Sequence, residues 1–339
     1  MAGIKCIHCN FVGYLEKQGI TFDGKTGDIP ISRSFKHKGH NYFLRQVLLA
    51  ALLGVAYAVP VMAAQIKLPA IVEPASQEHH VGKLIFVELV TPDLATTKQF
   101  YTGLFGWTFR DIQDGETKYA GAFLDGRPVA GLIHKNVPAG ERRQPAWLSF
   151  FSVRDVDAAK KVALQNAAKV LFEPHSIPDR GRVAVFADPQ GAIFAVLASS
   201  SGDPTDVLAE PGEWIWTSLI THDPETSAAF YQTLFDYEVF ELPAGQGTQH
   251  VLLASDNYAR ASVNTLPANR PNAHPHWLNY VRVEDAVKMA AKVVALGGRV
   301  LVEPQIDRHG GKVAVVADPF GAPFGLLEWP NTESKEVPK

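Results

Sequence analysis

The chain has 339 residues, of which 46% are hydrophobic and 20% are charged, and its formal net charge is −3. This length exceeds one ordinary domain and suits two, each with its own apolar core. The chain has neither a basic excess nor a run of Lys and Arg, so we expect no nucleic-acid partner. The only cysteines are Cys6 and Cys9, upstream of the expected domains, which excludes thiol catalysis and disulfides within those domains.

The first 63 residues have the pattern of an export signal. Residues 47–59 are continuously apolar, basic residues such as Arg45 precede them, and Val61-Met62-Ala63 offers a cleavage site. The apolar run is shorter than the ~20 residues that span a bilayer. We therefore predict an N-terminal extension plus signal peptide over 1–63, cleavage after Ala63, and a periplasmic or secreted protein. The alternative is an uncleaved signal anchor, which would be the only attachment to a membrane.

An internal repeat sets the domain organisation after a predicted linker over residues 64–80. Residue numbers of matching positions differ by 130 (231 − 101, for example) without a gap. Matching pairs include Phe100-Tyr101 with Phe230-Tyr231, Trp147-Leu148 with Trp277-Leu278, and Asp188-Pro189 with Asp318-Pro319. Agreement over this length indicates two copies of one domain rather than a solenoid of short units. We predict domain 1 over 81–200, domain 2 over 211–330 and a tail over 331–339.

Each copy contains a smaller pattern twice, a strand and a helix followed by three strands. In copy 1 the first half predicts a strand over 84–90, a helix from Asp93 to 105, and strands near 108–112, 119–124 and 129–134. The second half predicts a strand over 147–153, a helix over 155–168, and strands over 170–173, 183–187 and 193–198. Helix caps are expected at Asp93, Asp155, Asp223 and Asp285. The fold class is therefore α+β, with two βαβββ units in each domain.

The order of these motifs resembles the vicinal oxygen chelate superfamily of glyoxalases, bleomycin-resistance proteins and extradiol dioxygenases. The motifs are Thr-Pro-Asp or Thr-His-Asp before the first helix, Leu-Phe-Gly-Trp at 104–107, and Asp-Pro-x-Gly-Ala-x-Phe at 188–194 and 318–324. The resemblance covers Val81 to Trp329, and the tandem form is similar to a subgroup of glyoxalase-like hydrolases or antigens. It implies that paired βαβββ units curve a mixed sheet around a cavity.

Enzymes of this family hold a divalent metal in that cavity through His, Glu or Gln on the first, fourth, fifth and last strands. Counting from the turns puts Phe86, Leu148 and Ala195 at three of these positions in copy 1, and Trp216, Leu278 and Gly325 in copy 2. None of these side chains is a ligand for such a cation. We therefore expect no metal and no other cofactor. A rearranged divalent metal site, for example one through His274 and His276, is the alternative.

The alternation of side chains along a strand predicts what faces each cavity. Glu88 would lie beside Phe86 and Phe150 in copy 1, and Trp216, Ser218 and Tyr280 would line copy 2. A carboxyl in an apolar pocket has a raised pKa and suits a general acid or base, so Glu88 is the catalytic candidate. The alternatives are a solvated or ion-paired Glu88 and aromatic rings that only pack in the core. The loop pairs Asp179-Arg180 and Asp307-Arg308 are expected to be solvated, and the alternative is that they gate a pocket.

Three functions compete, and the sequence leaves open whether the chain is an enzyme. The first is an exported protein without the family metal site that binds a small apolar or aromatic molecule in its cavities. The second is a lyase, isomerase or hydrolase that uses Glu88 or a rearranged metal site. The third is an interaction module whose sheets bury a partner. The family pairs its copies within one chain or across two chains, so a homodimer is an open alternative. Fold alone does not choose among the three.

Overall fold

The computed structural model describes residues 67–114, 117–135, 146–241, 250–266, 273–306 and 311–329. The predicted signal peptide with its cleavage site, both cysteines, the Asp307-Arg308 pair and the predicted tail lie outside these ranges. No helix within these ranges is long and apolar enough to cross a membrane.

The helices and strands follow the predicted double repeat. Copy 1 consists of β1 (Leu84–Thr91), α1 (Leu94–Phe105), β2 (Thr108–Asp114), β3 (Thr117–Leu124), β4 (Arg127–His134), β5 (Trp147–Ser152), α2 (Val156–Gln165), β6 (Lys169–Ile177), β7 (Gly181–Ala187) and β8 (Ile193–Ser199). Copy 2 consists of β9 (Trp214–Thr221), α3 (Pro224–Phe235), β10 (Glu238–Glu241), β11 (His250–Ser255), β12 (Tyr258–Thr265), β13 (His276–Val283), α4 (Ala286–Ala295), β14 (Arg299–Ile306), β15 (Lys312–Ala317) and β16 (Pro323–Glu328).

Each copy folds into one eight-stranded mixed sheet. The strand orders are β2-β3-β4-β1-β5-β8-β7-β6 and β10-β11-β12-β9-β13-β16-β15-β14. In each sheet the first strand of the copy runs parallel to the fourth and antiparallel to the fifth. The two βαβββ halves of a copy therefore meet at the β1–β5 or β9–β13 pair. The α+β prediction of tandem paired βαβββ units is confirmed.

Asp side chains start all four helices as predicted. The Asp93 carboxylate accepts hydrogen bonds from the backbone N–H groups of Ala95 and Thr96, and Asp155, Asp223 and Asp285 cap α2, α3 and α4 in the same manner. These bonds satisfy N–H groups that have no partner inside a helix. The four aspartates are therefore structural.

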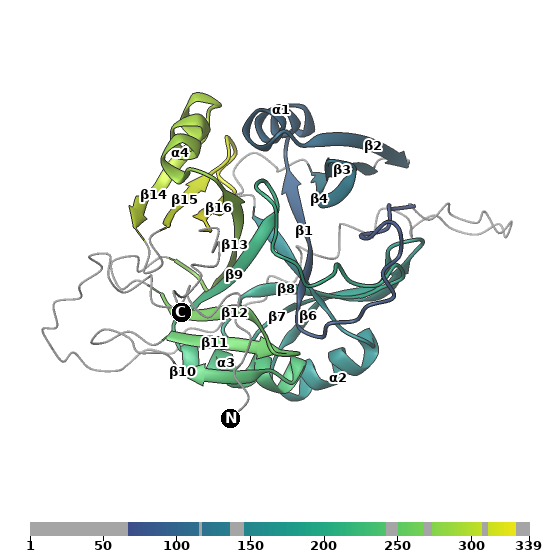
Figure 1. Cartoon of the computed structure of the whole chain (residues 1–339). Coiled ribbons are helices and arrows are strands. Elements are labelled where there is room, and N and C mark those ends of the chain that lie inside the picture. Colours follow the sequence, from purple (N-terminus) through teal and green to yellow (C-terminus); the bar gives the residue numbers. More distant parts are fainter. Residues whose placement is uncertain are drawn as a thin grey trace, which may run out of the picture.

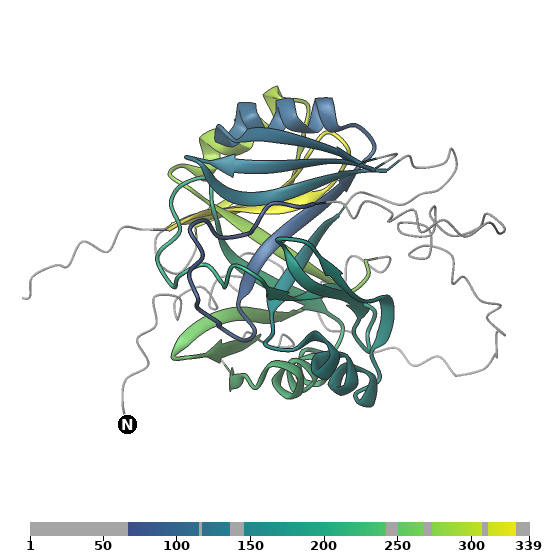
Figure 2. The same cartoon turned by 90° about the vertical axis from the view of Figure 1, so that its right-hand side faces the viewer.

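The copies pack on each other through their helical layers. α1 lies beside α4 at the top of the molecule and α2 beside α3 at the bottom, as two perpendicular views show (Figures 1 and 2). One apolar core joins the second half of copy 1 to the first half of copy 2, and another joins the first half of copy 1 to the second half of copy 2. Because both cores cross the boundary between the copies, we expect the two domains to unfold together.

The residues of the repeated motifs hold this interface. Tyr231, on α3, donates a hydrogen bond to the Asp188 carboxylate of copy 1 at 3.1 Å and accepts one from the Trp277 indole N–H at 3.0 Å. The Trp107 indole N–H donates to the carbonyl of Gly212 at 2.9 Å. At the matching position of copy 2, the Tyr237 hydroxyl donates to the carbonyl of Gly82.

These contacts explain why the motif aromatics and the aspartates of the Asp-Pro-x-Gly turns recur in both copies. They pair one copy with the other, and buried polar atoms of this kind need partners. The motif residues are therefore part of the interface and do not themselves form a candidate site.

Candidate functional site

Aromatic side chains form a row across the middle of each sheet, on the face opposite the helices. In copy 1 the strand register aligns Phe86 with Phe150 and Phe150 with Ala195. The Phe86 and Phe150 rings meet edge to face with centroids 6.2 Å apart. The structure thus brings together these two predicted binding residues of copy 1.

Copy 2 carries the matching row. Trp216 aligns with Tyr280, and Tyr280 aligns with Gly325. A Cβ atom at position 325 would clash with the Tyr280 ring, so this glycine makes room for the aromatic side chain. Trp216 and Tyr280 are almost fully buried, with 2% and 1% of their surface exposed.

These two rows include positions at which the family's enzymes bind their divalent metal, and their side chains do not fit a metal. Hard and borderline cations need imidazole, carboxylate or thiolate donors, and the rows supply phenyl, indole and phenol rings. Across the described ranges of the chain, no group of three His, Cys, Asp or Glu side chains could hold a metal ion. The loop pair His274 and His276 is held locally, since His276 Nδ1 lies 2.7 Å from the His274 carbonyl oxygen. We therefore derive no chemistry through a metal.

A buried polar cluster of three side chains, Glu88, Tyr119 and Arg180, adjoins the aromatic row of copy 1. Glu88 Oε1 lies 3.3 Å from the Tyr119 hydroxyl and 3.7 Å from Arg180 Nη1. Arg180 Nη2 donates a hydrogen bond to the Tyr119 hydroxyl at 3.0 Å. The guanidinium also lies over the Phe86 ring, 4.2 Å from its centroid, where a cation is attracted to the aromatic face. One carboxyl, one phenol and one cation are thus in contact in an apolar surrounding.

Burial sets the electrostatics of this cluster. It raises the pKa of the Glu88 carboxyl, and the Arg180 charge and the Tyr119 hydrogen bond oppose that rise. Burial also raises the pKa of the Tyr119 hydroxyl, so this phenol keeps its proton and acts as a donor. A carboxyl with a raised pKa and a fixed donor beside it is suited to act as a general acid or base. The prediction of a raised pKa for Glu88 agrees with this geometry, and the cluster also contains the alternative that the sequence left open, an ion pair.

A glycine makes the Glu88–Tyr119 contact sterically feasible. Gly131, on β4, is the register partner of Glu88 on the neighbouring strand. A Cβ atom at this position would clash with the Tyr119 hydroxyl and lie 3.0 Å from Glu88 Cγ. Any larger residue would therefore separate the phenol from the carboxyl.

The corresponding part of copy 2 is polar but uncharged. Ser218, at the position that matches Glu88, lies with its Oγ 2.8 Å from Ser262 Oγ. The Trp216 indole N–H donates to Ser262 Oγ at 3.2 Å. Burial raises the pKa of the Tyr280 hydroxyl, and a hydrogen bond with Ser218 opposes that rise. Ser218, Trp216 and Tyr280 are therefore in one cluster, as predicted, with a serine in place of Glu88. The buried His250 is the register partner of Asn264, whose side-chain amide donates to Ser262 Oγ of this cluster.

The expectation that Arg180 is solvated is wrong. Its side chain is buried, while the preceding Asp179 has a positive φ of 61° and stays exposed. This backbone turn directs the guanidinium inward, where Glu88 supplies the opposite charge. Sequence reasoning also missed Tyr119 and Gly131. Strand alternation could have suggested Tyr119, but the contact across β3, β4 and β1 depends on sheet register.

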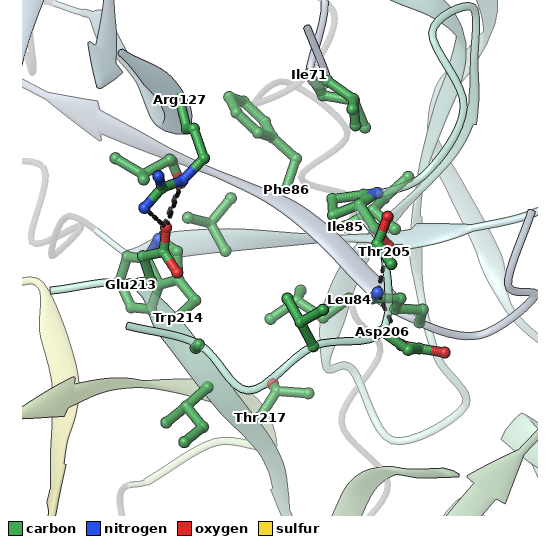
Figure 3. A pocket seen from close by; sticks show the side chains of 18 of the residues that line it. Ile71, Leu84, Ile85, Phe86, Arg127, Thr205, Asp206, Glu213, Trp214 and Thr217 are labelled. Carbon is green, nitrogen blue, oxygen red and sulfur yellow. Dashed lines mark hydrogen bonds and ion pairs between the residues drawn. The ribbon is translucent and has the colours of Figure 1, made fainter. Parts of the chain in front are cut away.

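A cavity of about 400 Å³ lies at the junction of the two copies. Its apolar wall includes Ile71, Ile85, Phe86, Trp214, Ile215 and Trp216. The cavity is bounded by the starts of β1 and β9 and by residues 204–209, the connection between the copies (Figure 3). Its volume falls in the range of small-molecule sites. The sequence did not predict a cavity at this position, although two of the predicted binding residues, Phe86 and Trp216, line it.

Charged side chains at the edge of this cavity are paired with one another. On one side the Arg127 guanidinium donates to Glu213 Oε1 at 2.7 Å, and Asp206 lies on the other side (Figure 3). Asp206 accepts from Arg260 at 2.6 and 2.9 Å and lies 2.8 Å from Lys83 Nζ. Burial alone would raise the pKa of Asp206, but the hydrogen bonds from Arg260 and Lys83 outweigh it and lower that pKa to about 2. With Glu73, the lining carries three acidic and three basic side chains, so its net charge is zero and the cavity favours an uncharged ligand.

Four of the predicted site residues do not line this cavity. Glu88 and Phe150 belong to the cluster and row of copy 1, and Ser218 and Tyr280 belong to those of copy 2; none of the four is a lining residue. Trp214 is part of the junction, where its indole N–H donates to the carbonyl of Val129 at 3.0 Å. Phe86 contacts Phe150 and Trp216 pairs with Tyr280, so the two rows adjoin the cavity through these two lining residues.

Comparison with known proteins is consistent with this fold. A model of the Glyoxalase/Bleomycin resistance protein/Dioxygenase superfamily matches residues 79–196, and a model of a glyoxalase-like domain matches residues 216–327. The chain is 33% identical over 259 residues to the glyoxylase candidate CFP32 of Mycobacterium bovis, covering 75% of this chain and 98% of that protein. It is 31% identical over 261 residues to the anthracycline biosynthesis protein DauV of Streptomyces sp. strain C5, covering 73% and 93%.

A solved structure supports the fold alone. The Mn(II)-bound glyoxalase of Novosphingobium aromaticivorans superposes with a TM-score of 0.51 at 16% identity, covering 74% of this chain and 83% of that one.

Proposed function

Because the chain belongs to the Glyoxalase/Bleomycin resistance protein/Dioxygenase superfamily, we propose a function on that fold: an exported protein that binds a small apolar or aromatic molecule without the family metal site. The observation that carries this proposal is the junction cavity, with Phe86 and Trp216 in its wall. Apolar walls and few polar groups are typical of small-molecule sites.

The cavity also suggests a class of ligand. Tryptophan rings stack well on flat aromatic molecules, and Trp214 and Trp216 both line the cavity. The acidic and basic side chains that line the cavity are equal in number, so the lining has no net charge to attract an ionic ligand. One relative is named an anthracycline biosynthesis protein, and an anthracycline is a flat polycyclic aromatic. We therefore propose a neutral, planar aromatic ligand.

Ligand binding can be tested with a neutral fluorescent probe, N-phenyl-1-naphthylamine, together with quenching of tryptophan fluorescence. We expect saturable binding to the wild type and a loss of about tenfold or more in affinity in Ala209→Phe, which fills part of the cavity. Ala158→Phe is the matched control, since Ala158 is an exposed residue on α2. Absence of binding to the wild type, or equal affinity in Ala209→Phe, would refute the proposal.

Export is proposed from the sequence pattern and has its own test. N-terminal sequencing of protein recovered outside the cytoplasm should begin at Ala64, the residue after the predicted cleavage site. Protein that stays in the cytoplasm with Met1 intact would contradict export. Protein that stays in the membrane with the apolar run intact would favour the uncleaved anchor.

A second candidate function is that of a lyase, isomerase or hydrolase that uses Glu88. The observation in its favour is the buried contact of Glu88 with Tyr119 and Arg180, because raised carboxyl pKa values are frequent at active sites. A panel of hemithioacetals, epoxides and esters should show a turnover that Glu88→Gln abolishes. Glu173→Gln, at an exposed position, should keep that turnover. A turnover unaffected by Glu88→Gln, with or without added metal, would reject this candidate.

A further inference from the structure

The start of the described chain lies against the concave face of copy 1. We name residues 67–76 the strap; it runs beside the sheet of copy 1 before the chain enters β1 (Figure 1). Leu68 and Ile71 are buried, with 7% and 3% of their surface exposed. Two apolar side chains of an otherwise largely exposed segment are thus withdrawn from solvent.

The strap enters the aromatic row of copy 1. Ile71 belongs to the same apolar cluster as Ile85, Phe86 and Phe150. A Cβ atom at Gly121, on β3, would lie 3.6 Å from Pro69 Cγ, so Pro69 packs over this glycine. The strap therefore covers the face on which the family places its ligands.

A backbone group of the strap also bonds to the polar cluster. Arg180 Nε donates to the Pro69 carbonyl at 3.0 Å, while Arg180 Nη2 donates to the Tyr119 hydroxyl. The same guanidinium thus contacts the strap, the phenol and Glu88. A buried guanidinium needs acceptors for its N–H groups, and the strap supplies one as an external ligand would.

Residues 199–203 anchor the other end of the strap. The Val72 N–H donates to Ser201 Oγ at 3.2 Å, and the Ser76 N–H donates to the Ser201 carbonyl at 2.9 Å. Gly202 has a φ of +79°, and a Cβ atom there would clash with Ser76 Oγ. These contacts hold the end of the strap against residues 199–203 of copy 1.

We propose that the concave face of copy 1 is a binding site for a short apolar peptide, and that residues 68–71 of this chain occupy it as an intramolecular ligand over Glu88, Tyr119 and Arg180. The strap thereby closes the site of copy 1 and leaves the junction cavity as the small-molecule site. This second consequence rests on the function proposed above, whereas occupation of copy 1 by the strap does not.

The first test measures whether the strap stays in place. In a Cys6→Ser/Cys9→Ser background, the single thiol of Leu68→Cys should react with a maleimide at least about tenfold more slowly than that of Ala75→Cys. Ala75 is the matched control because it lies in the same strap and is exposed. Equal labelling rates would overturn the proposal whatever the small-molecule experiments show.

The second test opens the site of copy 1 in the full chain. Leu68 is buried, and releasing the strap with Leu68→Asp also frees Ile71, which lines the junction cavity, so the readout is binding of the peptide and not of the small probe. We expect a fluorescently labelled synthetic peptide of residues 67–72 to bind to Leu68→Asp at one per chain and not to bind to the wild type or to Ala75→Asp. The same peptide with Asp in place of Leu68 should not bind to Leu68→Asp.

The outcomes separate the two proposals. If no variant binds the probe but Leu68→Cys is protected, the proposed function fails and the occupation of copy 1 stands. If Leu68→Asp binds no peptide, copy 1 is not a site that the strap closes, whether or not the wild type binds the probe. If the peptide with Asp in place of Leu68 binds equally well, the peptide does not bind at the site that Leu68 fills.

Discussion

Arg180→Met tests the electrostatic account of the buried cluster. Methionine keeps an apolar stem over the Phe86 ring but removes the charge. The variant loses two hydrogen bonds of 3.0 Å, to Tyr119 and to the Pro69 carbonyl, and leaves Glu88 without its cation. Hydrogen bonds from a charged donor contribute about 1.5 to 3 kcal/mol each, and breaking a buried ion pair costs about 3 to 5 kcal/mol. We expect a loss of about 3 to 5 kcal/mol in the free energy of unfolding near neutral pH.

The pH dependence of this loss gives the sharper test. The folded-state pKa of Glu88 is raised above its ordinary value of 4.5, so its ionisation costs stability as the pH rises from that value through the folded pKa. The Arg180 charge opposes the rise in the pKa of Glu88. Removing Arg180 therefore raises this pKa further and makes the loss of folding stability at high pH larger. The loss in free energy of unfolding caused by Arg180→Met should therefore be smaller at about pH 5 than at about pH 7.5.

Urea unfolding followed by tryptophan fluorescence at both pH values measures these differences. The double variant Glu88→Gln/Arg180→Met should be more stable than Arg180→Met near neutral pH, because no unpaired carboxylate remains. A penalty for Arg180→Met below about 1 kcal/mol, or one equal at both pH values, would refute the account of a buried pair.

Three further changes test the interface, the cluster and the edge of the cavity. Tyr231→Phe should cost about 1 to 3 kcal/mol in urea unfolding, since it leaves Asp188 Oδ2 without its donor and the Trp277 indole N–H without its acceptor; a loss within error would show that these contacts are dispensable. Gly131→Ala should cost about 1 to 3 kcal/mol, because the added methyl group displaces the Tyr119 hydroxyl; unchanged stability together with an unchanged Tyr119 ring in a solved structure of the variant would contradict it. Asp206→Asn should cost about 2 kcal/mol above pH 5, since the pKa of Asp206 is lowered from 3.8 to about 2. The stability that depends on this lowered pKa is present above 3.8 and is lost as the pH falls toward about 2, so the gap between wild type and variant should narrow over that range; a gap that does not depend on pH would contradict this assignment.

The sequence by itself determined the fold. The repeat, with matching positions such as Tyr101 and Tyr231, defines two copies, and local signals such as the Asp93 cap and the Asp188 turn place the elements within them. Periodicity and capping act between residues close in sequence, so they can be recognised without the structure. The apolar row at Phe86 and Trp216 was also predictable, because side-chain alternation along one strand is a local property.

Only the tertiary structure decided which side chains of the candidate sites lie in contact. Glu88 meets Tyr119 through the register of three strands, and it meets Arg180 because a loop far along the chain turns inward. The junction cavity and the strap over copy 1 involve segments more than 100 residues apart, such as Arg180 and Pro69 (separation 111). Such contacts depend on how complete elements pack, and a pattern that spans a few residues carries no information about them. The predicted solvation of Arg180 was wrong for this reason, since its counter-charge lies on another strand.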